Sequence, residues 1–403
     1  MKYIDFKRDA INMRDELVEI RRSLHKIPEI GFNEHETSKF IKRYLEEEIS
    51  IPFRSGLAGG TGIAATLEGA YPGPTIAIRT DIDALPIEER TELPFSSRNK
   101  GYMHACGHDG HMAIVLGTAK LLKKYASQLK GNVKFIFQPA EELSLGAKKM
   151  IDDGALENPK VDAIFGFHIW PEFEKNKIGI KDGTIMSAGD KFDIEIMGKG
   201  SHGAEPYKGI DPVIVTAEII SAIQTIVSRE MDLLRNTAVV SIGTLNGGTA
   251  FNIIPERVKI SGTIRSTDEK VQNRIPQSIK RIVEGISKAH NAKFLFKNTN
   301  VFPLTVNDEY IAKTSYEELK QSMEDEKVEW LKYPGMASED FSQYLSIVPG
   351  MYFFIGARED NRHTDLHNPD YNFDEDVLTL GVEAVTTLVY NFLEKNLVKN
   401  DSI

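Results

Sequence analysis

The order of apolar runs and amphipathic segments is the feature of this sequence that most constrains its fold. TIAIRTDIDALP (75–86) starts as a strand and ends in a turn-forming segment, and HMAIVLGTAKLLKKYASQLKG (111–131) has helical periodicity that closes on Gly131. Two further apolar runs, NVKFIFQPAEE (132–142) and VDAIFGFHIW (161–170), are typical of strands. This alternation predicts an α/β fold with a mostly parallel sheet flanked by helices.

A different order begins near residue 187. The predicted elements there are a strand at 190–198, a helix at 211–230, strands at 237–245 and 256–266, a helix at 268–290 and a strand at 292–298. This β-α-β-β-α-β order is typical of a ferredoxin-like α+β domain. A chain of 403 residues also exceeds the size at which a single core usually stops growing. We therefore predict a discontinuous first domain at 1–186 and 301–403, and an inserted second domain at 187–300.

Composition and charge exclude several classes of protein. Hydrophobic residues make up 41% and charged residues 27%, as in an ordinary folded protein. The formal net charge of −10 disfavours nucleic acid as a partner. The sequence has neither the apolar core of a signal peptide nor a run of about 18 apolar residues, so we expect no membrane span. A single cysteine cannot form an internal disulfide, which favours a reducing compartment and predicts a cytoplasmic protein.

Polar side chains follow the predicted strands at the point where each apolar run ends. Asp81 and Asp83 follow the first run, Glu141 and Glu142 follow the second, and His168 lies near the end of the third. Open α/β sheets generally place their ligands at the carboxyl ends of their strands. We therefore expect these five side chains to converge.

The stretch MHACGHDGH (103–111) holds the only cysteine of the chain. The thiol of Cys106 and the imidazole of His108 suit a transition metal such as Zn²⁺. The pattern alone leaves other interpretations open, because a lone cysteine is often a small buried apolar residue and the histidines could simply shape a loop. The adjacent carboxylates of Glu141 and Glu142 repel each other unless a cation offsets them, although a solvated acidic turn would also tolerate them. Their coincidence with His168 favours a metal site.

Ten motifs, in order along most of the chain, carry a resemblance to a known family. They are RRSLHKIPEIGFNEHET (21–37), RTDIDALPIEE (79–89), MHACGHDGH (103–111), FQPAEE (137–142), GFHIWP (166–171), GKGSHGAEPYKGIDP (198–212), GGTAFNIIPERV (247–258), GTIRS (262–266), ASEDFS (337–342) and LHNPDYNFDE (366–375). They resemble those of the zinc-type peptidase and amidohydrolase family, which includes carboxypeptidase G, aminoacylase, hippurate hydrolase and the plant indoleacetyl-amino-acid hydrolases. The chain looks most similar to the hippurate hydrolase and N-acyl-amino-acid amidohydrolase branch.

The resemblance implies a dinuclear metal site. By position, the implied ligands of two divalent ions (Zn²⁺, Mn²⁺, Co²⁺ or Ni²⁺) are Cys106, His108, Glu142, His168 and His367. Glu141 matches the general base, and Asp83 matches an aspartate that orients a ligand. His104, Asp109 and His111 are better suited to support the ligands or form the loop. Two ions about 3.5–4 Å apart can activate a hydroxide and polarise an amide carbonyl.

The resemblance also implies that the inserted domain completes the active site. In the family this domain pairs two subunits and acts as a lid, so we expect a homodimer or homotetramer. His202 matches a histidine that reaches the neighbouring subunit's metal centre, and Asn252 and Arg265 match residues that bind the substrate carboxylate. An arginine suits a carboxylate because its planar fork donates two hydrogen bonds. The alternative is that GKGSHGAEP is only a flexible glycine loop.

The leading hypothesis is metal-dependent hydrolysis of the amide bond of N-acyl-L-amino acids, which are small-molecule substrates. One alternative keeps the chemistry and makes the protein a metallo-carboxypeptidase or a dipeptidase. A second makes Cys106 a nucleophile, which predicts an enzyme that resists chelators and is blocked by alkylation. A third is a non-catalytic binding or dimerisation protein that retained the fold.

Overall fold

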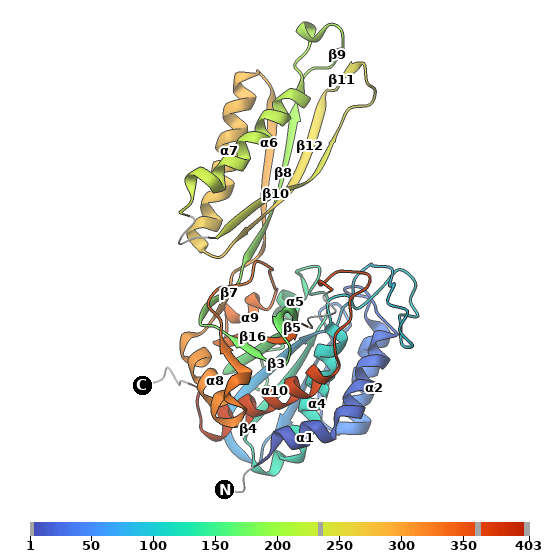
Figure 1. Ribbon diagram of the computed structural model, residues 1–403, viewed down its shortest axis with the longest axis vertical. Helices are drawn as coiled ribbons and strands as arrows, with labels where there is room; N and C mark the ends of the chain where they lie inside the picture. Colours follow the sequence, from blue (N-terminus) through green and yellow to red (C-terminus); the bar gives the residue numbers. More distant parts are fainter. Residues whose placement is uncertain (1–3, 233–236, 359–363, 399–403) are drawn as a thin grey trace. The chain divides into compact units, whose positions relative to one another are not determined.

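The computed structural model describes residues 4–232, 237–358 and 364–398. The chain forms two compact units (Figure 1). The first contains Met1–Ile185, Val306–Tyr333 and Asp340–Ile403, and the second contains Met186–Thr305 and Pro334–Glu339. The insertion predicted at 187–300 covers most of the second unit, and its role in dimerisation stays a prediction.

The first unit is built on an eight-stranded sheet with the order β1-β2-β4-β3-β5-β16-β6-β15. The strands are β1 (Phe53–Leu57), β2 (Gly62–Glu68), β3 (Tyr71–Asp81), β4 (Lys130–Gln138), β5 (Ala163–Glu174), β6 (Ile178–Ile180), β15 (Val328–Trp330) and β16 (Gly350–Arg358). The central neighbours β4, β3, β5 and β16 run parallel, whereas β1, β2 and β6 add antiparallel pairs. The prediction of a mostly parallel sheet is confirmed.

Helices flank this sheet. They are α1 (Phe6–Asn12), α2 (Arg14–His25), α3 (His35–Tyr44), α4 (His108–Lys124), α5 (Gly146–Asp152), α8 (Glu309–Ser322), α9 (Ser342–Leu345) and α10 (Asp376–Glu394). Helices α4 and α10 pack against each other and against β3, and most of their residues are buried (Figure 1). Buried central strands explain why the apolar runs of β3, β4 and β16 are nearly continuous.

The helix predicted at 111–131 is too long at its carboxyl end. Helix α4 stops at Lys124, and β4 already begins at Lys130. Gly131 lies inside β4 with φ +91°, and a side chain there would collide with the backbone of Pro74. This glycine therefore serves a close approach of two chain segments and does not end the helix.

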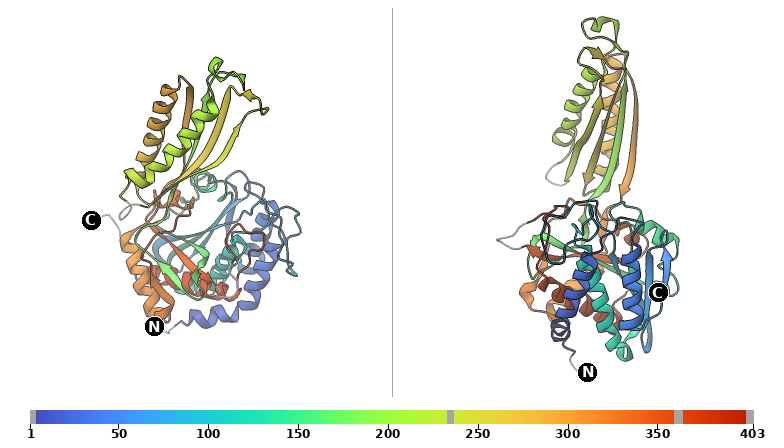
Figure 2. Two further views of the ribbon diagram at one scale, coloured as in Figure 1. Left: turned by 45° about the horizontal axis from the view of Figure 1, so that its top comes forward. Right: turned by 90° about the vertical axis from the view of Figure 1, so that its right-hand side faces the viewer.

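The second unit contains a four-stranded antiparallel sheet with the order β10-β12-β8-β13. Its main elements are β8 (Ala188–Met197), α6 (Pro212–Glu230), β10 (Ala238–Gly247), β12 (Arg257–Ser266), α7 (Glu269–Ala289) and β13 (Lys293–Phe302). Alternate side chains of β8, those of Phe192, Ile194 and Ile196, are buried in one core with α6 and α7. Figure 2 shows both helices on one face of this sheet. The predicted β-α-β-β-α-β order is confirmed.

Two of the described helices, α6 and α10, are long and apolar enough to cross a membrane by length and composition alone. Core helices of soluble proteins meet the same criterion. The apolar window of α10 is 78% buried within the protein. Helix α6 buries Val215, Ile219 and Ile223 in the core of the second unit, but only 33% of its apolar window is buried. Protein packing therefore accounts for the apolar residues of α10 and for part of those of α6, and the expectation that nothing spans a membrane stays a prediction.

Candidate metal centre

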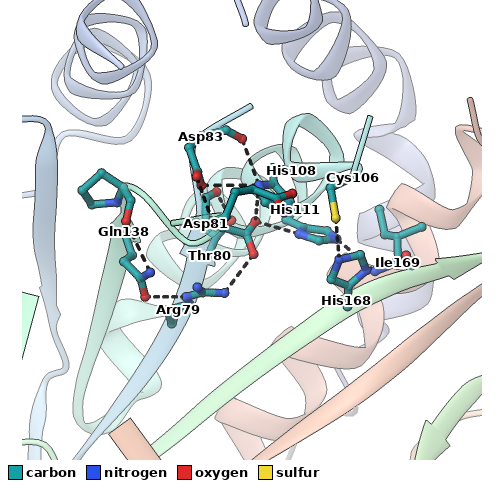
Figure 3. A network of polar contacts seen from close by, with 12 residues as sticks. Arg79, Thr80, Asp81, Asp83, Cys106, His108, His111, Gln138, His168 and Ile169 are labelled. Atoms are coloured by element: carbon teal, nitrogen blue, oxygen red, sulfur yellow. Dashed lines mark hydrogen bonds and ion pairs between the residues drawn. The ribbon is translucent and has the colours of Figure 1, made fainter. Parts of the chain in front are cut away.

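The carboxyl ends of β3 and β4 and the middle of β5 meet the start of α4 at one place in the first unit. Asp81, the last residue of β3, is opposite Gln138, the last residue of β4. The turn before α4 depends on Gly107, whose φ of +84° places it in the left-handed region that favours glycine. Cys106 and His108 flank this glycine and lie near His168 of β5 (Figure 3).

Cys106, His108 and His168 form a first group of possible metal ligands. Their donor atoms all lie within 4.8 Å of one another, and all three residues are buried. The Sγ atom of Cys106 lies 3.4 Å from Nε2 of His168 (Figure 3). The Nδ1–H of His168 donates to the Ile169 carbonyl at 2.7 Å, and that of His108 donates to the Asp83 carbonyl at 2.9 Å. In both rings Nε2 is therefore the nitrogen left for an ion.

Two further groups overlap with the first. Cys106, Glu142 and His367 bring their donor atoms within 4.8 Å of one another, as do His108, Glu141 and Glu142. Nε2 of His367 lies 3.4 Å from Oε1 of Glu142. The thiol is thus common to two groups. Glu142 and His108 are shared between groups as well, so the groups form one continuous cluster of possible ligands.

His367 adopts an uncommon backbone conformation. Its φ is +62°, in the left-handed region that side chains other than glycine rarely adopt. Its backbone N–H donates to the Ala105 carbonyl at 2.8 Å, directly beside Cys106. Such conformations persist only where the surrounding structure holds them, and they cluster at functional sites.

The electrostatics of the site fit a bound cation. Burial, together with the nearby carboxylates of Glu142 and Glu141, raises the pKa of the Cys106 thiol well above its ordinary value. Burial also raises the pKa of Asp83. Among the described residues, the buried Oδ1 of Asp83 has no hydrogen-bond partner, and Nδ1 of His108 lies 3.6 Å from it. A divalent cation would offset this negative charge, and coordination deprotonates a thiol.

The nearby carboxylates favour the protonated form of His108. Burial lowers the pKa of this imidazole, but Asp81 and Asp83 outweigh the burial and raise the pKa to about 10. An ion at Nε2 would displace this proton, so metal binding and proton release are linked at His108.

His111 supports the site and has no free donor for a metal. Its Nδ1–H donates to Oδ1 of Asp81 at 2.8 Å, and its Nε2 accepts the backbone N–H of Ile169 at 3.0 Å (Figure 3). Asp81, His108 and His111 also lie close enough to hold a metal, but the carboxylate of Asp81 is already paired with His111 and Arg79. His111 also contacts a neighbouring ligand directly, because its ring packs edge-on against the ring of His168, with the ring centroids 4.5 Å apart.

Arg79 lies beneath the site and is buried with two carboxylates. Its Nη1 donates to Oδ2 of Asp81, its Nη2 to Oδ1 of Asp340 and its Nε to Oε1 of Gln138, each at 2.8 Å. Gln138 in turn donates to both oxygens of Asp340 at 2.9 Å. The network was not predicted. A charged residue inside an otherwise apolar strand was the available signal, because a buried arginine requires buried acceptors.

A second buried network fixes the segment that carries His367. Arg21 donates to Oδ2 of Asp109 at 3.1 Å and to Oδ1 of Asn372 at 2.6 Å, and its guanidinium lies 3.9 Å from the centre of the Phe373 ring. Nδ1 of His25 lies 2.8 Å from the same oxygen of Asp109. Asp109 therefore joins α2 to the start of α4. This is a supporting position and not a ligand position.

The three predicted residues of the second unit lie on its strands and loops. The short strand β9 (Ser201–His202) pairs with β11 (Ile253–Ile254), and Gly203 N–H donates to the Asn252 carbonyl at 2.8 Å. His202 and Asn252 are therefore neighbours, and both are exposed. Arg265 lies on β12, where its Nη1 donates to Thr263 Oγ1 and, at 3.2 Å, to the Ile264 carbonyl. Burial lowers the pKa of Arg265.

Comparison with known proteins identifies the family. The sequence pattern of peptidase family M20/M25/M40 matches residues 77–391. The chain belongs to this family. Members of the M20 family are hydrolases of amide carbon–nitrogen bonds, and the predicted resemblance to metal-dependent peptidases and amidohydrolases is confirmed.

Individual relatives of this M20 protein cover nearly its whole length. N-acetyl-L-cysteine deacetylase from Bacillus subtilis is 42% identical over 364 residues, which are 90% of this chain and 85% of the relative. Thermostable carboxypeptidase 1 from Saccharolobus solfataricus is 37% identical, and the match covers 96% of this chain and 98% of the carboxypeptidase. The crystal structure of a dinuclear metal-binding M20 peptidase from Bacillus subtilis has a TM-score of 0.82 and 37% identity, covering 95% of this chain and 99% of that one.

Proposed function

We propose that this M20 hydrolase cleaves the amide bond of N-acyl-L-amino acids with two divalent metal ions, releasing a carboxylic acid and a free amino acid. The observation that carries the proposal is the position of Cys106, whose thiol belongs to two overlapping groups of possible ligands. The similarity to a deacetylase of an N-acetylated amino acid supports this substrate class.

We assign the ligands to Cys106, His108, Glu142, His168 and His367. When bound, the ions supply Lewis acidity that polarises the amide carbonyl and activates water. The donor set combines thiolate, imidazole and carboxylate, which suits Zn²⁺, Mn²⁺, Co²⁺ or Ni²⁺. We expect activity with more than one of these ions.

Glu141 acts as the general base in this proposal. Its side chain is buried beside Glu142, where it can take a proton from the attacking water and return it to the leaving amine. Asp83 orients the site, because its Oδ2 accepts the backbone N–H of Glu142 at 3.0 Å and its carbonyl accepts from His108. Asp83 thus supports two of the assigned ligands, Glu142 with its carboxylate and His108 with its backbone carbonyl.

The second unit contributes to substrate binding in the proposal. Asn252 and Arg265 bind the carboxylate of the amino acid, and His202 of a neighbouring subunit stabilises the oxyanion that develops on the amide oxygen. This requires a homodimer or homotetramer, with the second unit serving as the dimerisation and lid domain. We propose a cytoplasmic enzyme with no nucleic-acid or membrane partner.

A metallo-carboxypeptidase or dipeptidase is the second candidate function, and the similarity to a thermostable carboxypeptidase favours it. The test combines metal analysis of the purified protein with acetyl-, benzoyl- and indoleacetyl-amino acids assayed beside dipeptides. Preference for acyl amino acids, including hippurate-type benzoyl substrates, supports the leading proposal. Preference for dipeptides supports the second candidate.

Controls separate the remaining alternatives. Exhaustive chelation should abolish turnover, and added divalent metal should restore it. Full activity after chelation, with loss on alkylation, would instead make Cys106 a nucleophile. Glu141→Gln should remove turnover and keep the metal content near wild type, whereas a wild-type protein that turns over neither substrate class would be a binding protein.

A further inference from the structure

The carboxylate of Glu34 is buried in the first unit and belongs to no ligand group. The residue is 0% exposed and immediately precedes α3. A side chain at this position often caps the helix, but that of Glu34 makes no capping hydrogen bond. Its Oε1 instead accepts the backbone N–H of Ala140 at 3.0 Å, and its Oε2 accepts the hydroxyl of Thr61 at 2.8 Å.

Ala140 occupies a strained position directly before the two adjacent glutamates. Its φ is +55°, a conformation that residues other than glycine rarely adopt. The turn closes on the same residue, because Gly146 N–H donates to the Ala140 carbonyl at 3.2 Å and Ser144 N–H donates to the Glu141 carbonyl at 2.7 Å. The rotation at Ala140 determines the direction in which the chain enters Glu141.

Two buried carboxylates hold the backbone on either side of Glu141. Glu34 accepts the N–H of Ala140, and Asp83 accepts the N–H of Glu142 at 3.0 Å. Both acceptors are 0% exposed, so water does not compete for these bonds.

We propose that Glu34 is a positioning residue of the active site. Its hydrogen bond to Ala140 keeps that residue in the left-handed conformation, and thereby aims the carboxylates of Glu141 and Glu142. Without the bond, Ala140 relaxes toward negative φ and both side chains lose their direction. This inference rests on the proposed function in so far as Glu141 is the base and Glu142 a ligand.

The test uses the full-length protein loaded with Co²⁺, whose absorption reports its ligands. Glu34→Ala removes the bond to Ala140. Glu34→Gln keeps a carbonyl acceptor for Ala140 and an amide that can donate to the oxygen of Thr61. Thr61→Val is the matched control, because it removes the other hydrogen bond of Glu34 and leaves Ala140 untouched. The readouts are kcat, KM, Co²⁺ affinity by chelator competition and the Co²⁺ spectrum.

We expect Glu34→Ala to lower kcat by about tenfold or more, with KM nearly unchanged, because an assigned ligand and the base are misdirected together. Its Co²⁺ spectrum should change and its Co²⁺ affinity should fall. Glu34→Gln and Thr61→Val should both stay near wild type in all four measurements. If Glu34→Ala does not fold, Glu34→Asp replaces it, since the shorter side chain withdraws the acceptor and retains the charge.

Three results would overturn the proposal: an unchanged kcat and Co²⁺ spectrum in Glu34→Ala or its Asp replacement, a Glu34→Gln variant as impaired as Glu34→Ala, or a Thr61→Val variant equally impaired. Glu141→Gln is measured in parallel. If it retains turnover, the assigned base is wrong, but the Co²⁺ spectrum still tests whether Glu34 positions Glu142. If it is inactive while Glu34→Ala is normal, the proposed function stands and the role of Glu34 fails.

Discussion

Nε2 of His168 faces the thiol of Cys106 across 3.4 Å, and its other ring nitrogen is bound to the Ile169 carbonyl. The ring therefore cannot turn away without breaking that bond, which leaves the thiol and Nε2 directed at one point. A cation at this point would join the loop before α4 to the middle of β5.

Replacing the thiol tests this relationship. Cys106→Ser should lower metal affinity on the order of 100-fold or more and reduce activity in parallel, since changing even a residue that supports a ligand costs 10–100-fold. Metal content by elemental analysis and kcat are measured on the same samples. Loss of activity with both ions fully retained would show that the thiol has a role other than binding metal.

His111 should matter for metal binding although it has no free nitrogen. His111→Phe removes its bonds to Asp81 and Ile169, so the His168 ring loses its support, and we expect metal affinity to fall by roughly 10–100-fold. Chelator competition measures the change. The exposed His35 provides the control variant His35→Phe, which should bind metal as wild type does. Equal affinities for the two variants would contradict the assigned support.

Removing the charge of Arg79 should destabilise the protein. Arg79→Met leaves Asp81 and Asp340 buried without their cation, and breaking a buried ion pair costs about 3–5 kcal/mol of unfolding free energy. Denaturant titration of the metal-free protein measures the loss. The matched control is Arg90→Met, which breaks an exposed pair with Asp370 and should cost no more than about 1 kcal/mol. A small loss in Arg79→Met would mean that the two buried carboxylates are protonated or hydrated.

Glu34 predicts a pH dependence of stability. Burial and the nearby carboxylate of Asp83 raise the pKa of Glu34 from 4.5 to about 7. The folded protein therefore holds the carboxyl proton of Glu34 more tightly than the unfolded chain does. The stability that the protonated carboxyl group contributes is lost as pH rises from about 4.5 to 7. Because Gln cannot ionise, Glu34→Gln should gain stability relative to wild type over this window, by about 2–3 kcal/mol.

The measurement is denaturant unfolding of the metal-free wild type and Glu34→Gln at pH 5 and pH 8. Glu36→Gln is the control, because the Glu36 side chain is exposed. The free energy of unfolding of Glu36→Gln should differ from that of wild type by the same amount at both pH values. If the free energy of unfolding of Glu34→Gln also differs from that of wild type by the same amount at pH 5 and pH 8, Glu34 is already ionised at pH 5.

The sequence predicts well which side chains meet at the candidate site when a polar residue directly follows an apolar run. Asp83 and Glu141 could be placed together because parallel strands end at one edge of a sheet. His168 was expected at the end of its strand, but β5 continues to Glu174, so this residue lies mid-strand. His367 could not be placed in that way. It lies in a loop with φ +62°, and only its resemblance to a family motif singled it out before the structure showed it beside Glu142.

The supporting residues were harder to predict, for two physical reasons. Glu34 contacts Ala140 across 106 positions of sequence, and no local periodicity links residues so far apart. Arg79 lies in a strand whose apolar neighbours indicate burial, but nothing nearby in the sequence identifies Asp340 as its partner. Hydrophobic patterns report which face is buried, whereas these pairs depend on how buried charges are matched in three dimensions.

The supports supplied by Glu34 and His111 have a consequence for how this protein can vary. Both side chains act on peptide N–H groups, those of Ala140 and Ile169, and not on the side chains of these residues. We therefore expect no covariation between positions 34 and 140, or between 111 and 169, among related sequences. The backbone N–H alone supplies these two bonds, so proline is barred from both positions. At position 140 the φ of +55° and full burial restrict the side chain further, for reasons unrelated to Glu34.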